Sequence, residues 1–100
     1  MIIVEGSARI PEDAWERAEA AMRKMIVASR FEDGCVEYAY SRDLIDTNLL
    51  RIIERWKDRD ALVSHFAEPH MAEFRQALAE IGPQDLKVRM YEAEPEPLPL

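Results

Sequence analysis

The order of helix-like and strand-like segments constrains the fold of this chain more than any other feature. Between residues 15 and 29, apolar side chains recur every three or four positions with polar residues between them. This spacing predicts an amphipathic helix. Pro11 and the acidic Glu12 mark the helix start, and Gly34 marks its end, because glycine tolerates positive φ. The apolar stripe consists of Trp15, Ala18, Met22, Met25, Ile26 and Ser29.

Four other segments have the β-branched or alternating pattern of strands. One helical region, 15–29, separates the first two strands, and a second follows the third. In this second region Asp58 is a suitable N-cap for a short helix through Phe66, Pro69 interrupts the helix, and Gly82 ends a further helix. We predict strands over residues 1–9, 35–41, 49–56 and 86–93.

The resulting βαββαβ order is typical of the α+β, ferredoxin-like fold, with helices on one face of a four-stranded sheet. A length of 100 residues suits a single domain. We assign residues 1–94 to that domain and residues 95–100 to a proline-rich C-terminal tail that cannot join a sheet.

Large apolar side chains occur in both sets of alternating strand positions, which predicts a sheet that is apolar on its second face as well. A second copy of the chain would cover such a face, so we expect a homodimer formed by pairing sheet faces. The residues that suggest this are Val36, Tyr38, Tyr40 and Ile53.

Composition excludes several classes of partner. Thirteen basic against twenty acidic residues give a net charge of −7, which argues against binding to nucleic acid or to anionic lipid. A single cysteine, Cys35, allows no internal disulfide, and we interpret it as a packed thiol. The first residues lack a secretory signal pattern, and no apolar run is long enough for a membrane span, so we expect a cytoplasmic protein.

Few residues could carry chemistry. His65 and His70 are the only histidines, and either could act as a base near neutral pH. Each could equally be a structural residue, packed on a helix or near a helix start. Glu54 interrupts the apolar series on one strand face, so it is either a functional buried carboxylate or half of an ion pair with an arginine. Trp56 beside it belongs either to the core or to a substrate pocket.

We expect no metal site, because the two histidines are five residues apart across a proline and Glu68 is a poor third ligand there. The three glycines are isolated, so fingerprints for nucleotides and flavins are absent.

The chain resembles the antibiotic biosynthesis monooxygenase family over about residues 1–94. The most specific feature is Glu-x-Trp at residues 54–56, followed by a Pro-His pair at 69–70. The resemblance rests on Gly34-Cys35-Val36-Glu37-Tyr38, Arg42-Asp43, Asn48, Glu54-Arg55-Trp56, Asp58, Ala61-Leu62, His65-Phe66, Glu68-Pro69-His70-Met71, Phe74 and Tyr91-Glu92.

This resemblance implies a dimeric α/β barrel made of two ferredoxin-like units, with a pocket between sheet and helices in each. Characterised members include quinol and anthrone monooxygenases that use no metal, flavin or haem, so the resemblance implies no cofactor. Haem-degrading relatives place a haem-ligating histidine where this chain has Arg75, which argues against haem.

Oxygenation without a cofactor requires a substrate that becomes electron-rich when it loses a proton, together with a positioned base in a dry aromatic pocket. We expect His65 to act either as the base or as a hydrogen-bonding partner for the substrate, a small hydroxylated aromatic compound that reacts with O₂. Two alternatives are an isomerase of the same fold, with His65 and Glu54 moving protons, and a non-catalytic dimer that binds a small metabolite. We expect Glu54 to be the second catalytic residue. The substrate-binding residues expected from the resemblance are Trp56, Tyr38, Phe66, His70 and Phe74.

Overall fold

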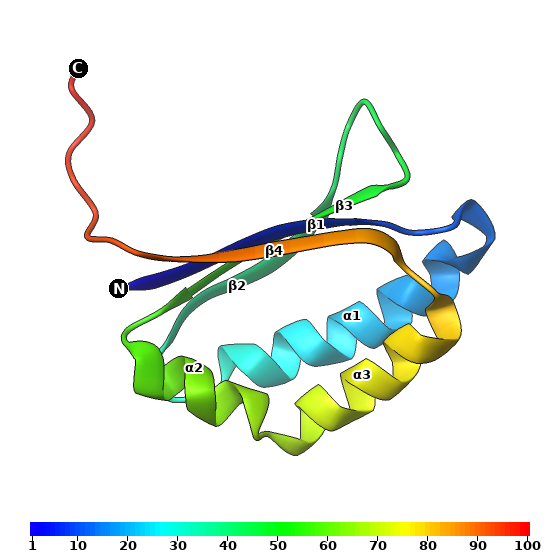
Figure 1. Ribbon diagram of the computed structural model, residues 1–100, viewed down its shortest axis with the longest axis horizontal. Coiled ribbons are helices and arrows are strands. Elements are labelled where there is room, and N and C mark those ends of the chain that lie inside the picture. The colour runs from blue at the N-terminus through cyan, green and yellow to red at the C-terminus, as the bar shows by residue number, and fades with distance from the viewer.

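The computed structural model describes all residues, 1–100, and confirms the predicted order of elements (Figure 1). A short 3-10 turn over Glu12–Ala14 leads into the first helix, and the second helical region is divided in two at Pro69. The elements are β1 (Ile2–Arg9), α1 (Trp15–Arg30), β2 (Cys35–Arg42), β3 (Leu49–Trp56), α2 (Arg59–Phe66), α3 (Pro69–Ile81) and β4 (Gln84–Glu92).

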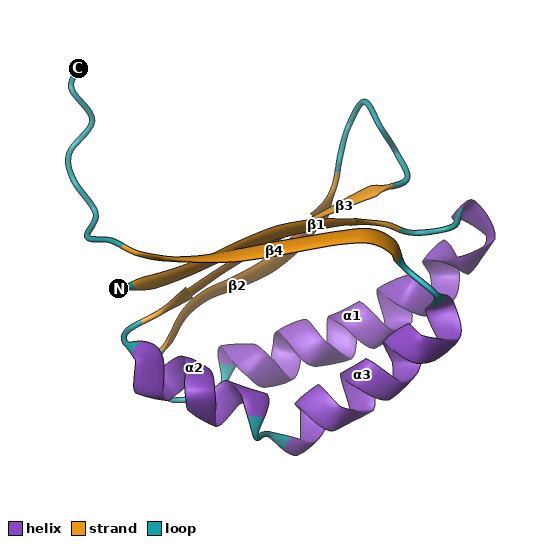
Figure 2. Ribbon diagram, in the orientation of Figure 1, coloured by secondary structure: helices purple, strands orange, loops and turns teal.

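The four strands form one antiparallel sheet in the order β2-β3-β1-β4. All three α-helices lie on the same side of this sheet, as Figure 2 shows. The α+β, ferredoxin-like fold is therefore confirmed. None of the helices combines the length and the apolar character that crossing a membrane requires.

Local sequence signals fix the helix ends. The Asp58 carboxylate accepts a hydrogen bond from the Ala61 amide at 2.8 Å, which caps α2 as predicted. Pro69 is the first residue of α3, where its missing N–H costs nothing. Gly82 ends α3 with a φ of 70°, a conformation that glycine adopts without strain.

The core lies between the three helices and the strands β1, β2 and β3. Its largest side chain, Trp56, is fully buried, and Tyr38 is 2% exposed. The other buried apolar residues of this cluster are Ile2, Val4, Ile10, Ala14, Ala18, Met22, Met25, Leu50, Ala61, Leu62, Phe74 and Ile81.

The predicted apolar second face of the sheet is wrong. A bulge near Val36 lets Cys35 pair with Trp56 while Glu37 pairs with Arg55, so the alternation shifts within β2. Tyr38 consequently faces the helices, and so does every second residue after it. Of the four residues that suggested an apolar second face, Ile53 alone has a regular ladder position there, and most of its neighbours are charged: Glu5, Glu37, Arg51, Arg55, Lys87 and Arg89.

The exposed apolar surface lies instead on β4, on the side that faces the helices. Leu86, Val88 and Met90 are 60%, 51% and 44% exposed. Met90 pairs with the buried Val4 of β1, which places it on the helix side of the sheet. The helices therefore cover β2, β3 and β1 but leave β4 open.

Candidate functional site

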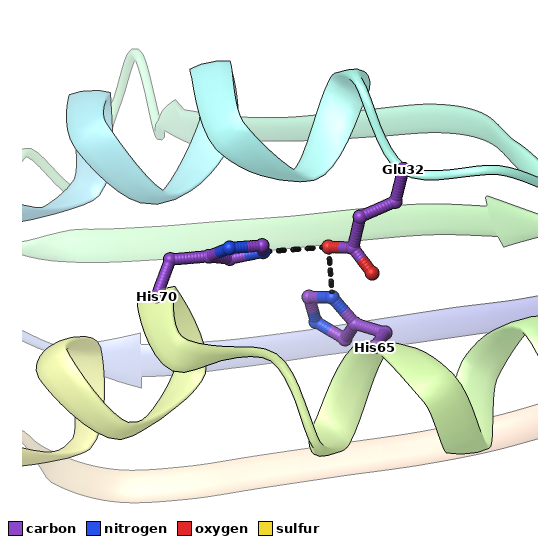
Figure 3. A group of neighbouring side chains, drawn as sticks. All are labelled: Glu32, His65 and His70. Carbon is purple, nitrogen blue, oxygen red and sulfur yellow. Dashed lines mark hydrogen bonds and ion pairs between the residues drawn. The ribbon is translucent and has the colours of Figure 1, made fainter.

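Both histidines meet one carboxylate oxygen of Glu32, a residue distant from them in the sequence (Figure 3). Oε2 of Glu32 lies 2.7 Å from Nδ1 of His65 and 2.7 Å from Nε2 of His70. His65 is 1% exposed, and the side chains of Glu32 and His70 are 8% and 18% exposed. The protein thus holds both of its histidines against a single, largely buried glutamate.

Each member of this cluster comes from a different element. Glu32 lies in the turn after α1, where its amide donates to the Ser29 carbonyl and its carbonyl accepts from the Cys35 amide. His65 is in the last turn of α2, and His70 is the second residue of α3. The break at Pro69 therefore turns the chain so that the two histidines approach Glu32 from neighbouring helices.

Aromatic rings enclose His65 on several sides. Its ring centroid lies 4.6 Å from that of Trp56, 5.4 Å from that of Tyr38 and 5.7 Å from that of Phe66. Nδ1 is held by Glu32, while the opposite nitrogen, Nε2, has no hydrogen-bond partner in the protein. In the tautomer in which Nδ1–H donates a hydrogen bond to Glu32, Nε2 keeps a lone pair in an aromatic environment.

Glu54 lies next to this group on the helix side of β3. It is 8% exposed, and its Oε1 accepts a hydrogen bond from the indole N–H of Trp56 at 3.0 Å. The ion pair with an arginine that the sequence left open is not formed, since Arg55 points to the opposite sheet face and pairs with Glu37. Burial raises the pKa of Glu54 above its usual value, because the low-polarity interior disfavours the charged carboxylate.

Two buried phenols continue the cluster along β2. The hydroxyl groups of Tyr38 and Tyr40 lie 2.8 Å apart, and Tyr40 packs against Phe74 with ring centroids 6.0 Å apart. Burial raises the pKa of both tyrosines above the usual value, so both stay neutral at physiological pH. They can supply O–H hydrogen-bond donors but not phenolate bases. The Ser29 hydroxyl nearby is buried without a hydrogen-bond partner.

One cavity, of about 480 Å³, lies on the sheet face away from the helices and is lined by Glu5, Arg51 and Arg89. Three others lie around the cluster rather than within it. A cavity of about 300 Å³ between α1 and α3 is lined by His70 and Phe74, together with Met25. A second cavity of about 370 Å³ is lined by Glu32 and Glu68 at the start of α2. A third, of about 460 Å³ between α1 and β2, is lined by Tyr40. His65, Glu54, Trp56 and Tyr38 line none of these three, because they pack directly against one another.

The structure therefore brings the predicted site residues into one connected group. His65 contacts Trp56, Tyr38 and Phe66, and the latter is 48% exposed at the end of α2. Phe74 joins the group only through Tyr40. Glu32 was missed, because nothing in a turn sequence indicates which distant side chains it will meet. Glu32, His65 and His70 place three potential metal-ligand atoms close together. Glu32 is therefore the third group of this set, in place of the Glu68 that the sequence analysis considered.

Comparison with known proteins agrees with this architecture. The family model for antibiotic biosynthesis monooxygenase matches residues 1–77. A Deinococcus radiodurans structure described as a "putative antibiotic biosynthesis monooxygenase" superposes with a TM-score of 0.91 at 28% identity, covering 100% of this chain and 99% of that one. The Mycobacterium tuberculosis protein Rv0793 superposes with a TM-score of 0.85 at 27% identity, over 95% of this chain and 96% of its own.

A curated relative from Synechocystis, the uncharacterized protein sll1783, is 30% identical over 90 residues, which is 90% of this chain. The chain spans only 61% of the length of that relative. The match of the family model to most of the chain, in agreement with these structures, shows that the chain belongs to the antibiotic biosynthesis monooxygenase family.

Proposed function

We propose that this protein is a monooxygenase that oxidises a small hydroxylated aromatic substrate of the quinol or anthrone type with O₂ and without a cofactor. The observation that carries the proposal is the state of His65. One of its ring nitrogens is fixed by Glu32 at 2.7 Å, the other is free, and aromatic rings surround it.

His65 is the proposed base. A carboxylate that accepts a hydrogen bond from Nδ1–H fixes the tautomer in which Nε2 is unprotonated. The same carboxylate stabilises the imidazolium that forms when Nε2 takes a proton. Glu32 has this role here. Removing the proton from a phenolic substrate produces an electron-rich anion that can reduce O₂ directly.

The reaction balances without an external reductant when a ring CH₂ group is the site of oxidation. Conversion of CH₂ to C=O removes four electrons and two protons from the substrate, and O₂ accepts all four electrons. One oxygen atom becomes the carbonyl oxygen and the other leaves as water. The phenol hydroxyl groups of Tyr38 and Tyr40 are the neutral donors proposed to stabilise developing oxyanions.

Substrate must displace part of the packing to reach the base, because His65 is only 1% exposed. Phe66 is the neighbouring ring with the most freedom, since it is 48% exposed and lies at the end of α2. Rotation of Phe66 toward solvent would open a path to His65. We propose Phe66, Phe74 and His70 as residues of the substrate-binding region, with Glu54 orienting groups within it.

A second copy of the chain completes the proposed functional unit. Leu86, Val88 and Met90 expose apolar side chains on the helix side of β4, where a partner would cover them. We therefore propose a homodimer in which residues 1–94 form the functional domain. The tail, residues 95–100, lies outside it.

An isomerase is the second candidate. Burial raises the pKa of Glu54, so this carboxyl retains its proton at a higher pH than an exposed glutamate does. Glu54 as proton donor and Nε2 of His65 as proton acceptor would form the acid and base pair that a carbonyl isomerase needs. This candidate would consume no O₂.

An oxygen electrode separates these candidates. With an anthrone or a quinol as substrate, we expect the wild-type protein to consume O₂ and His65→Asn to lose about 100-fold or more of that rate. Asparagine retains a donor for Glu32 but provides no base. Ser64→Ala, on the exposed side of the same helix, is the matched control.

Three outcomes contradict the proposal. Equal turnover by wild type and His65→Asn rejects the role of His65. Proton exchange at a carbonyl substrate without O₂ uptake supports the isomerase instead. Stabilisation of the fold by these aromatics without any turnover identifies a binding protein.

A further inference from the structure

The cluster of Glu32, His65 and His70 has a property that the proposed oxidation does not use. Its three ligand atoms, one carboxylate oxygen and two imidazole nitrogens, lie within 4.8 Å of one another. In Figure 3 the ring nitrogens of both histidines point at the same carboxylate from two sides. This convergence is formed by tertiary packing, since Glu32 is 33 residues from His65 and 38 from His70.

The donor set selects a class of ion. Two imidazoles and one carboxylate are the ligands of many zinc sites that keep a fourth position for water. Hard ions such as Mg²⁺ and Ca²⁺ prefer sites made of oxygen atoms, so they fit these residues poorly. The ligands of a tetrahedral zinc ion lie about 3.3 Å apart. The two 2.7 Å contacts would therefore lengthen by about 0.6 Å, and the two imidazole nitrogens, which lie within 4.8 Å of each other, would approach to a similar spacing.

The surroundings favour entry of a cation. Glu32 lines the cavity of about 370 Å³, which also carries the carboxylates of Asp33, Asp58, Asp60 and Glu68 and only one cation, Lys57. The negative charge of this cavity raises the local concentration of cations near the cluster. His70 lines the adjacent cavity between α1 and α3, so a ligand atom of the cluster borders open space on that side too. Water can reach the fourth coordination position from there.

Two of the three ligands are also positioned before any ion arrives. Glu32 is fixed by backbone hydrogen bonds to Ser29 and Cys35, and the backbone carbonyl of His65 accepts from the Glu68 amide at 3.1 Å. His65 is wedged between aromatic rings. A site whose ligands are already positioned loses little conformational entropy on binding.

We propose that Glu32, His65 and His70 form a binding site for one divalent transition-metal ion of the Zn²⁺ type per chain. Coordination would use Nδ1 of His65, Nε2 of His70 and the Glu32 carboxylate, with water completing the shell. The inference goes beyond the proposed oxidation, which needs no metal. A bound ion would replace the hydrogen bond by which Glu32 orients His65.

Calorimetric titration of the chelator-treated full chain with ZnCl₂ tests the site without any substrate. We expect one Zn²⁺ per chain, no measurable binding of Mg²⁺, and a visible Co²⁺ spectrum of the intensity that tetrahedral coordination gives. Glu32→Gln and His70→Ala should each weaken Zn²⁺ binding at least tenfold, since each removes a direct ligand. His65 is left unchanged because its replacement could disturb the core.

Two variants serve as controls. Glu68→Gln removes a charge from the same cavity without removing a ligand, and Cys35→Ser removes the only thiol. Both should bind Zn²⁺ within about threefold of wild type. If Glu32→Gln and His70→Ala bind as tightly as these controls while their circular dichroism is native, or if wild type binds no ion, the proposal is wrong. Failure of the oxidation assay has no bearing on this result.

Discussion

The two halves of the sheet differ sharply in how the single chain covers them. On β2 and β3, the residues that face the helices are enclosed, so that Trp56 is fully buried and Tyr38 is 2% exposed. On β4, the residues that face the same way remain open, and Met90 is 44% exposed. Stabilisation by burial scales with the apolar area removed from water, so the enclosed residues of β2 and β3 stabilise a single chain more than the exposed residues of β4 do. The surface of β4 is available for a partner.

The largest expected effect contrasts Trp56 with Met90. We expect Trp56→Ala to lower the free energy of unfolding by about 3–5 kcal/mol, because it leaves a large cavity in the core. Met90→Ala should cost less than about 1 kcal/mol in a single chain, because that side chain is already partly in water. Urea denaturation, followed by far-UV circular dichroism because one variant lacks a tryptophan, measures the free energy of unfolding of both variants.

Protein concentration sharpens this contrast. If a second copy covers β4, the cost of Met90→Ala should increase as the protein is concentrated into the dimer. A cost that stays small at every concentration, with a single-chain mass in sedimentation, would contradict the proposed homodimer. A cost for Trp56→Ala below that of Met90→Ala would contradict the comparison itself.

The next effect compares two glycines with positive φ. Gly34, with a φ of 84°, precedes β2 in the enclosed half, and an added Cβ would lie 2.7 Å from the Cβ of Ala61. Gly82, with a φ of 70°, precedes β4, and an added Cβ would have nothing within 4 Å. Both substitutions by alanine incur the backbone cost of about 1 kcal/mol, and Gly34→Ala adds overpacking of about 1–3 kcal/mol. Thermal unfolding should therefore show the larger loss for Gly34→Ala, and equal losses would contradict the packing at this position.

The smallest effect concerns the buried carboxylate. Burial raises the pKa of Glu54, so the folded state binds its proton more tightly than the unfolded state does. Its contribution to stability is complete below the usual value of 4.5 and is lost as the pH rises through the raised pKa. Glu54→Gln should thus be more stable than wild type at higher pH, by up to about 1 kcal/mol, with the difference shrinking toward pH 4.

Glu5→Gln is the control for the loss of one negative charge, because Glu5 lies exposed on the opposite sheet face. Unfolding curves recorded between pH 4 and pH 8 give the comparison. A Glu54→Gln variant whose advantage over wild type does not change with pH would show that burial does not control this carboxyl.

Much of the fold followed from short-range patterns, and part of the site did too. The positions of Leu50, Ile52, Glu54 and Trp56 on one strand face were predicted from alternation alone. The Asp58 cap and the Gly82 stop were likewise predicted, because each depends on hydrogen bonds or φ angles within a few residues. Alternation failed in β2, where the bulge near Val36 depends on register with β3.

The sequence by itself determined the order of helices and strands, the cap at Asp58 and the stop at Gly82, and that a carboxylate would be buried in β3. The tertiary structure alone decided that Glu32 joins His65 to His70 and that β4 stays uncovered. The reason is that periodicity and capping are properties of neighbouring residues. Contacts between residues more than 30 positions apart depend instead on how all the elements pack together.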